Sequence, residues 1–179
     1  MSDANQGSKR KLVIKIIIPV LIVCIVMTIW ILKNSQKSNA TVSGNPDFAL
    51  LVTDEIDLDQ LKSYGIPILL DFGSDSCVPC QELAPVIEEL NQELQGKAIV
   101  RYLDVWKYPA LAQNYPITVI PTQLFIDAKG NPYVPEDANA IALHMFATKD
   151  TNVHIFTTHE GGLTKNEFLS ILKEMGMKE

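Results

Sequence analysis

The sequence predicts an α/β domain, built on a central mixed sheet flanked by helices and preceded by one transmembrane helix. A predominantly apolar run over residues 12–32 predicts the membrane helix. From Phe48 onward, short apolar segments typical of strands alternate with longer segments of helical periodicity. This alternation indicates a parallel pair of strands, and a strand–turn–strand pattern late in the chain indicates an antiparallel part of the sheet.

The apolar run at residues 12–32 is long enough to span a membrane, since a helix rises about 1.5 Å per residue and the hydrocarbon core is about 30 Å thick. Lys15 and Trp30 lie near its two ends, where lysines reach the interface and aromatic residues are common. A buried core helix fits poorly, because no face of the run is polar. A cleaved signal peptide would end at Ala40, and a lipoprotein signal would use Cys24. The run is too long for a signal core and continues past Cys24, so we expect a retained anchor.

The distribution of charge predicts the orientation of the chain. Four basic residues precede or open the apolar run and two follow it closely: Lys9, Arg10, Lys11 and Lys15, then Lys33 and Lys37. The positive-inside rule therefore predicts a cytoplasmic tail at residues 1–11 and an extracytoplasmic remainder. Residues 33–46 are polar and form the expected linker to a domain at residues 47–179. Beyond residue 40 the chain holds nine of its 15 basic and 20 of its 21 acidic residues, which argues against nucleic acid as a partner.

In the first half of the domain, the sequence predicts three strands and two helices. Ile66–Phe72 is a continuous apolar run, which is typical of a buried central strand. Asp57–Tyr64 and Val78–Leu94 have apolar residues at helical spacing, and Pro85 should kink the second of these helices. The remaining strands are expected at Phe48–Thr53 and Ala98–Val105.

In the second half, the sequence predicts a short helix, two further strands and a closing helix. A short helix at Pro109–Asn114 precedes a strand at Thr122–Asp127, which a turn at residues 128–131 follows. The last strand is expected at Val153–Thr158, and Thr164–Met175 has the pattern of an amphipathic helix.

Two cysteines, Cys77 and Cys80, lie where the central strand passes into the long helix. Residues i and i+3 at a helix start share one face and are close enough to form a disulfide. A structural disulfide closing so short a loop would gain little chain entropy. A zinc site needs four ligands, and the three histidines of the chain have no ligand spacing, so we expect no metal. A redox pair is the favoured interpretation.

The two cysteines are expected to have different roles. Cys77 should face the helix N-terminus, where partial positive charge favours the thiolate, so it is the predicted nucleophile. Cys80, one turn further into the helix, should be more buried and should act as the resolving thiol that attacks the mixed disulfide.

Several separated motifs, in order, resemble the thioredoxin family over about residues 48–178. Asp71, in the strand that leads to the cysteines, falls on the buried acid of that family. Pro85 falls on its helix-kinking proline, Ile120 and Pro121 on its cis-proline loop, and Gly161 on the glycine bend before its last helix. The resemblance implies a thioredoxin fold.

The resemblance also implies roles for these residues. Asp71 would take a proton from Cys80, since a buried carboxylate has a raised pKa. The backbone of Ile120, held by cis Pro121, would pair with an extended substrate segment. Pro79, Pro85 and Gly161 would be structural. The simpler alternatives are a solvated acid at Asp71 and an ordinary trans proline at Pro121.

The sequence departs from the family in three places. Ser76 stands where tryptophan is usual before the first cysteine, and Tyr102 aligns with the lysine partner of the buried acid. An insertion at about residues 131–152 precedes the last strand and includes Ala138–Ala147, interpreted as a short helix. Its apolar and aromatic side chains either contact a partner or form a satellite cluster, the latter being favoured: Tyr133, His144, Met145 and Phe146.

The resemblance implies a thiol–disulfide oxidoreductase without a cofactor, acting on protein disulfides outside the cytoplasm. Pro79 between the cysteines, the absence of a histidine there, and Asp71 as a proton acceptor all favour a reductase. Such enzymes are re-reduced by a membrane thiol-transfer protein. A disulfide oxidase or isomerase stays open as an alternative. A non-catalytic adaptor is disfavoured, because Cys77, Cys80, Asp71 and Pro121 are all present.

Overall fold

A computed structural model describes Met27, residues 45–137 and residues 140–178. The predicted tail, the predicted membrane helix apart from Met27, and nearly all of the linker lie outside these residues. Within the described parts of the chain, no helix combines the length and apolar character needed to cross a membrane.

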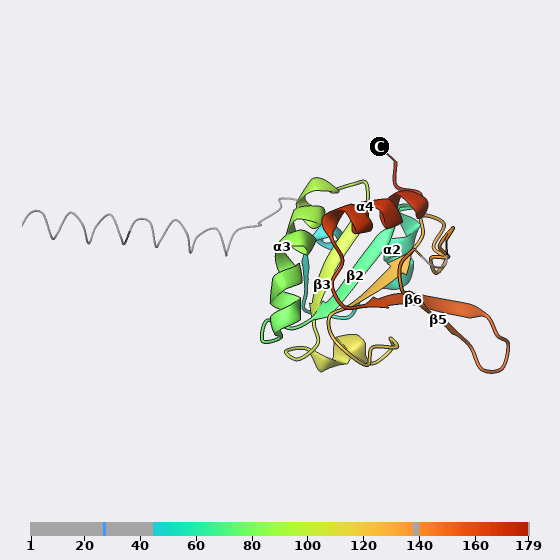
Figure 1. The fold of residues 1–179 in the computed structure, drawn as a ribbon, viewed down its shortest axis with the longest axis horizontal. Helices are drawn as coiled ribbons and strands as arrows, with labels where there is room; N and C mark the ends of the chain where they lie inside the picture. Colours follow the sequence, from blue (N-terminus) through green and yellow to red (C-terminus); the bar gives the residue numbers. More distant parts are fainter. Residues whose placement is uncertain (1–26, 28–44, 138–139, 179) are drawn as a thin grey trace, which may run out of the picture. The chain divides into compact units, whose positions relative to one another are not determined.

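The described domain is built on a six-stranded mixed sheet (Figure 1). In spatial order the strands are β1 (Leu51–Val52), β3 (Ile99–Asp104), β2 (Ile68–Gly73), β4 (Thr122–Ile126), β6 (His154–Glu160) and β5 (His144–Ala147). The pairs β1–β3 and β3–β2 are parallel, whereas β2–β4, β4–β6 and β6–β5 are antiparallel. The predicted mixed α/β sheet is therefore confirmed.

Helices cover both faces of the sheet. On one face, α3 (Val78–Glu93) and α4 (Lys165–Glu174) pack in one apolar core with Leu69 and Phe125. On the other face, α2 (Leu58–Ser63) and the 3-10 helix η2 (Pro109–Ala112) share a second core with strand residues that include Leu70. Because side chains alternate along a strand, β2 contributes to both cores and is buried throughout.

The first predicted strand is too long. Residues Pro46–Phe48 form a 3-10 helix, η1, and only Leu51–Val52 pair with β3. Asn45 caps η1 by accepting a hydrogen bond from the Asp47 N–H, and Pro46 fixes the first helical φ. This local cap outweighs the apolar pattern that predicts a strand from Phe48.

The helix predicted at Ala138–Ala147 is wrong, because its last four residues form strand β5 along the edge of β6. Pairing gives the backbone of β6 the hydrogen bonds that an open edge would lack. The resulting hairpin projects from one side of the domain (Figure 1, orange to red). The predicted satellite cluster is also wrong, since Tyr133 is buried in the core of α3 and α4 while Met145 is half exposed.

Candidate active site

The two cysteines lie at the junction of β2 and α3. After β2 ends at Gly73, the chain turns, and the N–H of Cys77 donates to the carbonyl of Ser74 at 3.1 Å. Cys77 is the N-cap residue of α3, and its Cα lies 5.2 Å from that of Cys80. Their sulfur atoms are joined as a disulfide. Cys80 is 2 % exposed and Cys77 8 %, so the deeper cysteine is the one further into the helix.

The N-terminus of α3 presents a positive electrostatic end to Cys77. No side chain caps this end, and its first turn holds no acidic residue. The unpaired N–H groups therefore favour negative charge on a sulfur placed there, as in a thiolate or a departing thiolate. Pro79 lies in this first turn, where a missing N–H removes no helical hydrogen bond, whereas Pro85 lies inside the helix.

The loop before β4 places its backbone beside the disulfide. The peptide bond between Ile120 and Pro121 is cis, and the Ile120 carbonyl oxygen lies 3.9 Å from Cys77 Sγ. The hydroxyl of Thr122 donates to the Val119 carbonyl at 2.8 Å. The N–H of Gly161, a residue with φ +103°, donates to the Pro121 carbonyl at 2.9 Å. These bonds hold the proline loop against the bend that follows β6.

Asp71 is buried beneath the cysteines, on the face of β2 that α3 covers. It is 1 % exposed, and burial raises the pKa of its carboxyl from 3.8 to about 7, although a hydrogen bond from Gln123 opposes part of this rise. Two residues further along β2, a Cβ built on Gly73 would lie 3.4 Å from Cys80 Cβ. A carboxyl that exchanges its proton near neutral pH thus lies on the side of the strand that faces the resolving cysteine.

Tyr102 lies beside Asp71 on β3, in register with it. Burial, and then the charges of Asp75, Asp104 and Asp71, raise the pKa of its phenol, which donates a hydrogen bond to Asp75. The phenol is therefore neutral at physiological pH and gives the ionised Asp71 none of the charge stabilisation that a lysine here would supply. This leaves burial as the main influence on the pKa of Asp71.

Asp104, at the end of β3, joins two loops next to the disulfide, and the sequence analysis missed it. Its carboxylate accepts hydrogen bonds from the N–H groups of Asp75 at 3.3 Å, Trp106 at 3.0 Å and Lys107 at 2.9 Å. An acid at the end of a buried strand is the sequence signal that could have identified it.

Gln123 was also missed, although an amide side chain in the buried strand Thr122–Ile126 is an unusual signal. Its Nε2 donates to Asp71 Oδ1 at 2.8 Å. The structure therefore brings together Cys77, Cys80, Ile120 and Pro121 in one site, with Asp71 and Gln123 below them.

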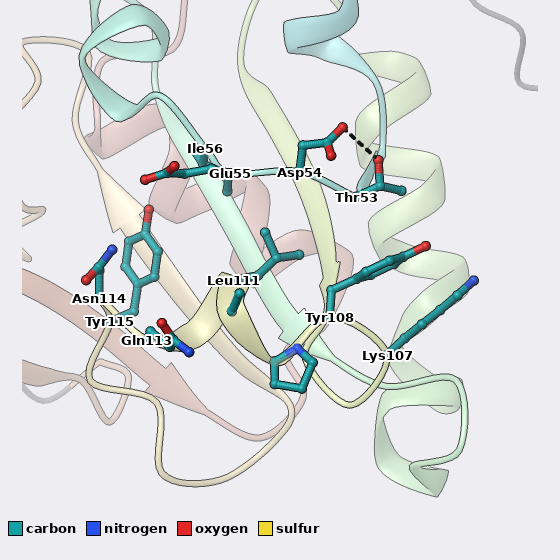
Figure 2. Close-up of a pocket in the computed structure, with 12 residues that line it drawn as sticks. Thr53, Asp54, Glu55, Ile56, Lys107, Tyr108, Leu111, Gln113, Asn114 and Tyr115 are labelled. Carbon is teal, nitrogen blue, oxygen red and sulfur yellow. Dashed lines mark hydrogen bonds between the residues drawn. The ribbon is translucent and has the colours of Figure 1, made fainter.

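A separate cavity of about 490 Å³ lies between the loop after β1 and the segment from Lys107 to Tyr115 (Figure 2). Figure 2 shows Tyr108 and Tyr115 on its wall, together with Asp54, whose carboxylate accepts a hydrogen bond from Thr53. Neither cysteine lines this cavity, so it is distinct from the disulfide site. Across the described residues, His, Cys, Asp and Glu side chains form no group of three suited to a metal ion.

The thioredoxin family model matches residues 48–147, more than half of the chain. The chain belongs to the thioredoxin family. A thioredoxin from Chlorobaculum thiosulfatiphilum is 42 % identical over 82 residues, which are 46 % of this chain and 74 % of that protein. A thioredoxin from Staphylococcus aureus is 37 % identical over 84 residues, which are 47 % of this chain and 79 % of that protein.

A solved structure of a variant thioredoxin from Halobacterium salinarum has the same fold, with a TM-score of 0.51 at 23 % identity. The match covers 76 % of this chain and 98 % of that one. With its family established and a Cys-x-x-Cys pair at disulfide distance, the chain is an enzyme of the thiol–disulfide oxidoreductase type.

Proposed function

We propose that this chain is a membrane-anchored reductase of protein disulfides that works outside the cytoplasm. The observation that carries the proposal is the position of the Cys77–Cys80 pair, at the N-terminus of α3 and above the buried Asp71. A pair built only for stability would need no proton acceptor beneath it. The anchor at residues 12–32 and the charge on its two sides support the proposed location.

In the proposed reaction, the thiolate of Cys77 attacks one sulfur of a substrate disulfide. A bond forms between Cys77 and that sulfur, and the other substrate sulfur leaves as a thiolate, which takes a proton from solvent. The ionised carboxylate of Asp71 then accepts the proton of Cys80. The Cys80 thiolate attacks Cys77 Sγ, and the second substrate sulfur leaves and is protonated. The substrate gains two electrons, and the chain ends as the disulfide seen in the structure.

The site offers a docking edge for the substrate during this exchange. The backbone at Ile120, next to cis Pro121, lies beside Cys77 and can pair with an extended substrate segment, as a strand adds to a sheet edge. Such pairing would place the substrate disulfide over Cys77 without requiring one particular substrate sequence.

Two features of the site favour reduction of the substrate as the direction of the reaction, and two oppose it. Pro79 lies between the cysteines without a histidine, and Asp71 is suited to deprotonating Cys80. Against this, Ser76 and Tyr102 replace the tryptophan and lysine of the family. Potentials of about −270 mV for thioredoxin and about −120 mV for a strong oxidase differ by about 7 kcal/mol, more than one hydrogen bond supplies. Ser76 and Tyr102 should therefore shift the reduction potential by less than the difference between these two values.

Each turnover leaves the oxidised form, so an electron donor must reduce it. Soluble cytoplasmic reductants cannot reach a domain outside the membrane, and we propose a membrane thiol-transfer protein as the donor.

Equilibration of the purified chain with graded glutathione buffers tests the direction. The expected potential is nearer to about −270 mV than to about −120 mV. A potential more positive than about −170 mV would make a disulfide oxidase or isomerase the better assignment.

A further inference from the structure

A row of polar side chains crosses four neighbouring strands beneath the disulfide. Tyr102 on β3 pairs with Asp71 on β2, Asp71 pairs with Gln123 on β4, and Gln123 pairs with His159 on β6. Residues opposite one another on adjacent strands point to the same face and lie within contact distance. The neighbouring positions on this face, Leu69 and Phe125, belong to the apolar core of α3 and α4.

Gln123 is the member of this row that has a buried polar atom without a hydrogen-bond partner in the described part of the chain. Its side chain is fully buried, and its Nε2 donates to Asp71 Oδ1 at 2.8 Å. Its Oε1 is buried and has no hydrogen-bond partner among the described residues. Leaving an amide oxygen unpaired in a core costs free energy, so we expect this oxygen to be used in another state of the protein.

We propose that Gln123 is a positioning residue for the proton of Asp71. Its side-chain amide donates a hydrogen bond to the ionised carboxylate and rotates to accept a hydrogen bond from the protonated acid. An ionised carboxylate only accepts hydrogen bonds, whereas a protonated one also donates through its O–H. Rotation of the terminal amide by about 180° exchanges Nε2 and Oε1 in the same place. The unpaired Oε1 is then the acceptor held for the protonated state.

This arrangement suits a carboxyl that gains and loses a proton in every catalytic cycle. With one partner for each state, Asp71 keeps its position whether it is charged or neutral, so the resolving step begins from a fixed geometry. An apolar neighbour would satisfy neither state. The role rests on the proposed function of Asp71 as the base for Cys80, and it extends that function to a second residue.

The titration of Asp71 must be distinguished from that of the other ionisable groups on this face of the sheet. Tyr102 on β3 and His159 on β6 share its row, and Cys77 and Cys80 lie at the start of α3. On α4, which packs over the same face, Lys165 forms ion pairs with Glu89 and Glu93 of α3. The ring Nδ1 of His159 is 2.8 Å from the carbonyl oxygen of Ala142, so it is the donor there. Apart from burial, the hydrogen bond from Gln123 is the one influence resolved on the pKa of Asp71.

NMR titration of the oxidised full chain tests the amide directly, because neither cysteine titrates in the disulfide form. The side-chain amide resonances of Gln123 should shift with the same midpoint as the carboxyl carbon of Asp71. Asp71→Asn should abolish that shift, and His159→Asn should leave it in place. Amide resonances that stay constant while Asp71 titrates, or that follow His159 instead, would overturn the proposal.

A second measurement uses Gln123→Met, which keeps the side-chain length and removes the hydrogen bond. The midpoint of Asp71 should rise by about one pH unit, because the bond lost from the charged carboxylate is stronger than the bond lost from the neutral acid. At pH 7 the resolving step should slow by about fivefold, and the difference should nearly vanish by pH 9, where Asp71 is ionised in both proteins. An unchanged or lower midpoint would overturn the role of Gln123.

A buried amide elsewhere in the domain provides the matched control. Asn91 is buried on α3, and its Nδ2 donates to the carbonyl oxygens of Val100 and Phe48. Asn91→Leu should lower stability and leave the midpoint of Asp71 unchanged. If Asp71→Asn fails to slow the resolving step, the proposed role of Asp71 as a base fails, while the wild-type NMR titration still decides whether Gln123 follows its proton.

Discussion

Burial of the Asp71 carboxyl should make the fold less stable as pH rises. Its pKa is about 7 in the folded chain and 3.8 when unperturbed. Between these values the folded state keeps a proton that the unfolded state has lost, so the stability present below about pH 4 is lost as pH rises through about 7. The difference is about three pH units at about 1.4 kcal/mol each, which gives a loss of up to about 4 kcal/mol. Asp71→Asn, similar in shape and unable to ionise, should remove this loss.

Urea unfolding of the oxidised chain between pH 5 and pH 8 measures this effect. Asp71→Asn should be the more stable protein at pH 8, by up to about 4 kcal/mol, and should lose most of the pH dependence of the wild type. Asp150→Asn is the control, because Asp150 is exposed in the turn between β5 and β6, and it should keep the wild-type dependence. Parallel stability curves for the wild type and Asp71→Asn would refute the reasoning.

The same substitution should separate the two chemical steps. Asp71→Asn should slow the resolution of a mixed disulfide more than its formation, because the missing carboxylate serves Cys80. Stopped-flow measurements of both steps against pH would show this, and an unchanged profile for resolution would remove Asp71 from the mechanism.

Further changes test the cysteines, the packing and the anchor. Cys77→Ser should abolish disulfide reduction, whereas Cys80→Ser should trap a mixed disulfide visible on a non-reducing gel; equal trapping by both would mean that the roles are wrong. Gly73→Ala would place a Cβ 2.8 Å from Tyr102 Cε2, so it should destabilise the fold by about 1–3 kcal/mol. Tyr102→Leu in the same chain should recover part of that loss in urea unfolding, and no recovery would indicate another cause. Membrane fractions extracted with carbonate should retain the chain with residues 1–40 attached; a mature protein that begins at Thr41 would contradict the anchor.

The sequence by itself determined the features that depend on neighbouring residues. The spacing of the cysteines places Cys77 at the start of α3 and Cys80 one turn inside it, because residues i and i+3 share a helix face. Apolar periodicity located α3 and β2 to within one or two residues, since it reflects which face of each element is buried. The family motifs also placed Asp71 and Pro121 in one site. Periodicity failed where local capping or sheet pairing decided, at η1 and at β5.

Only the tertiary structure decided which distant residues meet. Gln123 follows Asp71 by 52 positions, and the antiparallel register of β2 and β4 alone puts its amide against that carboxylate. The edge strand β5 likewise exists because β6 offers an open edge, which no local pattern in residues 144–147 reveals. Strand register and edge pairing are non-local, because they depend on the packing of the whole sheet. The sequence therefore indicates which groups can do the chemistry, and the fold determines the neighbours that control their protons.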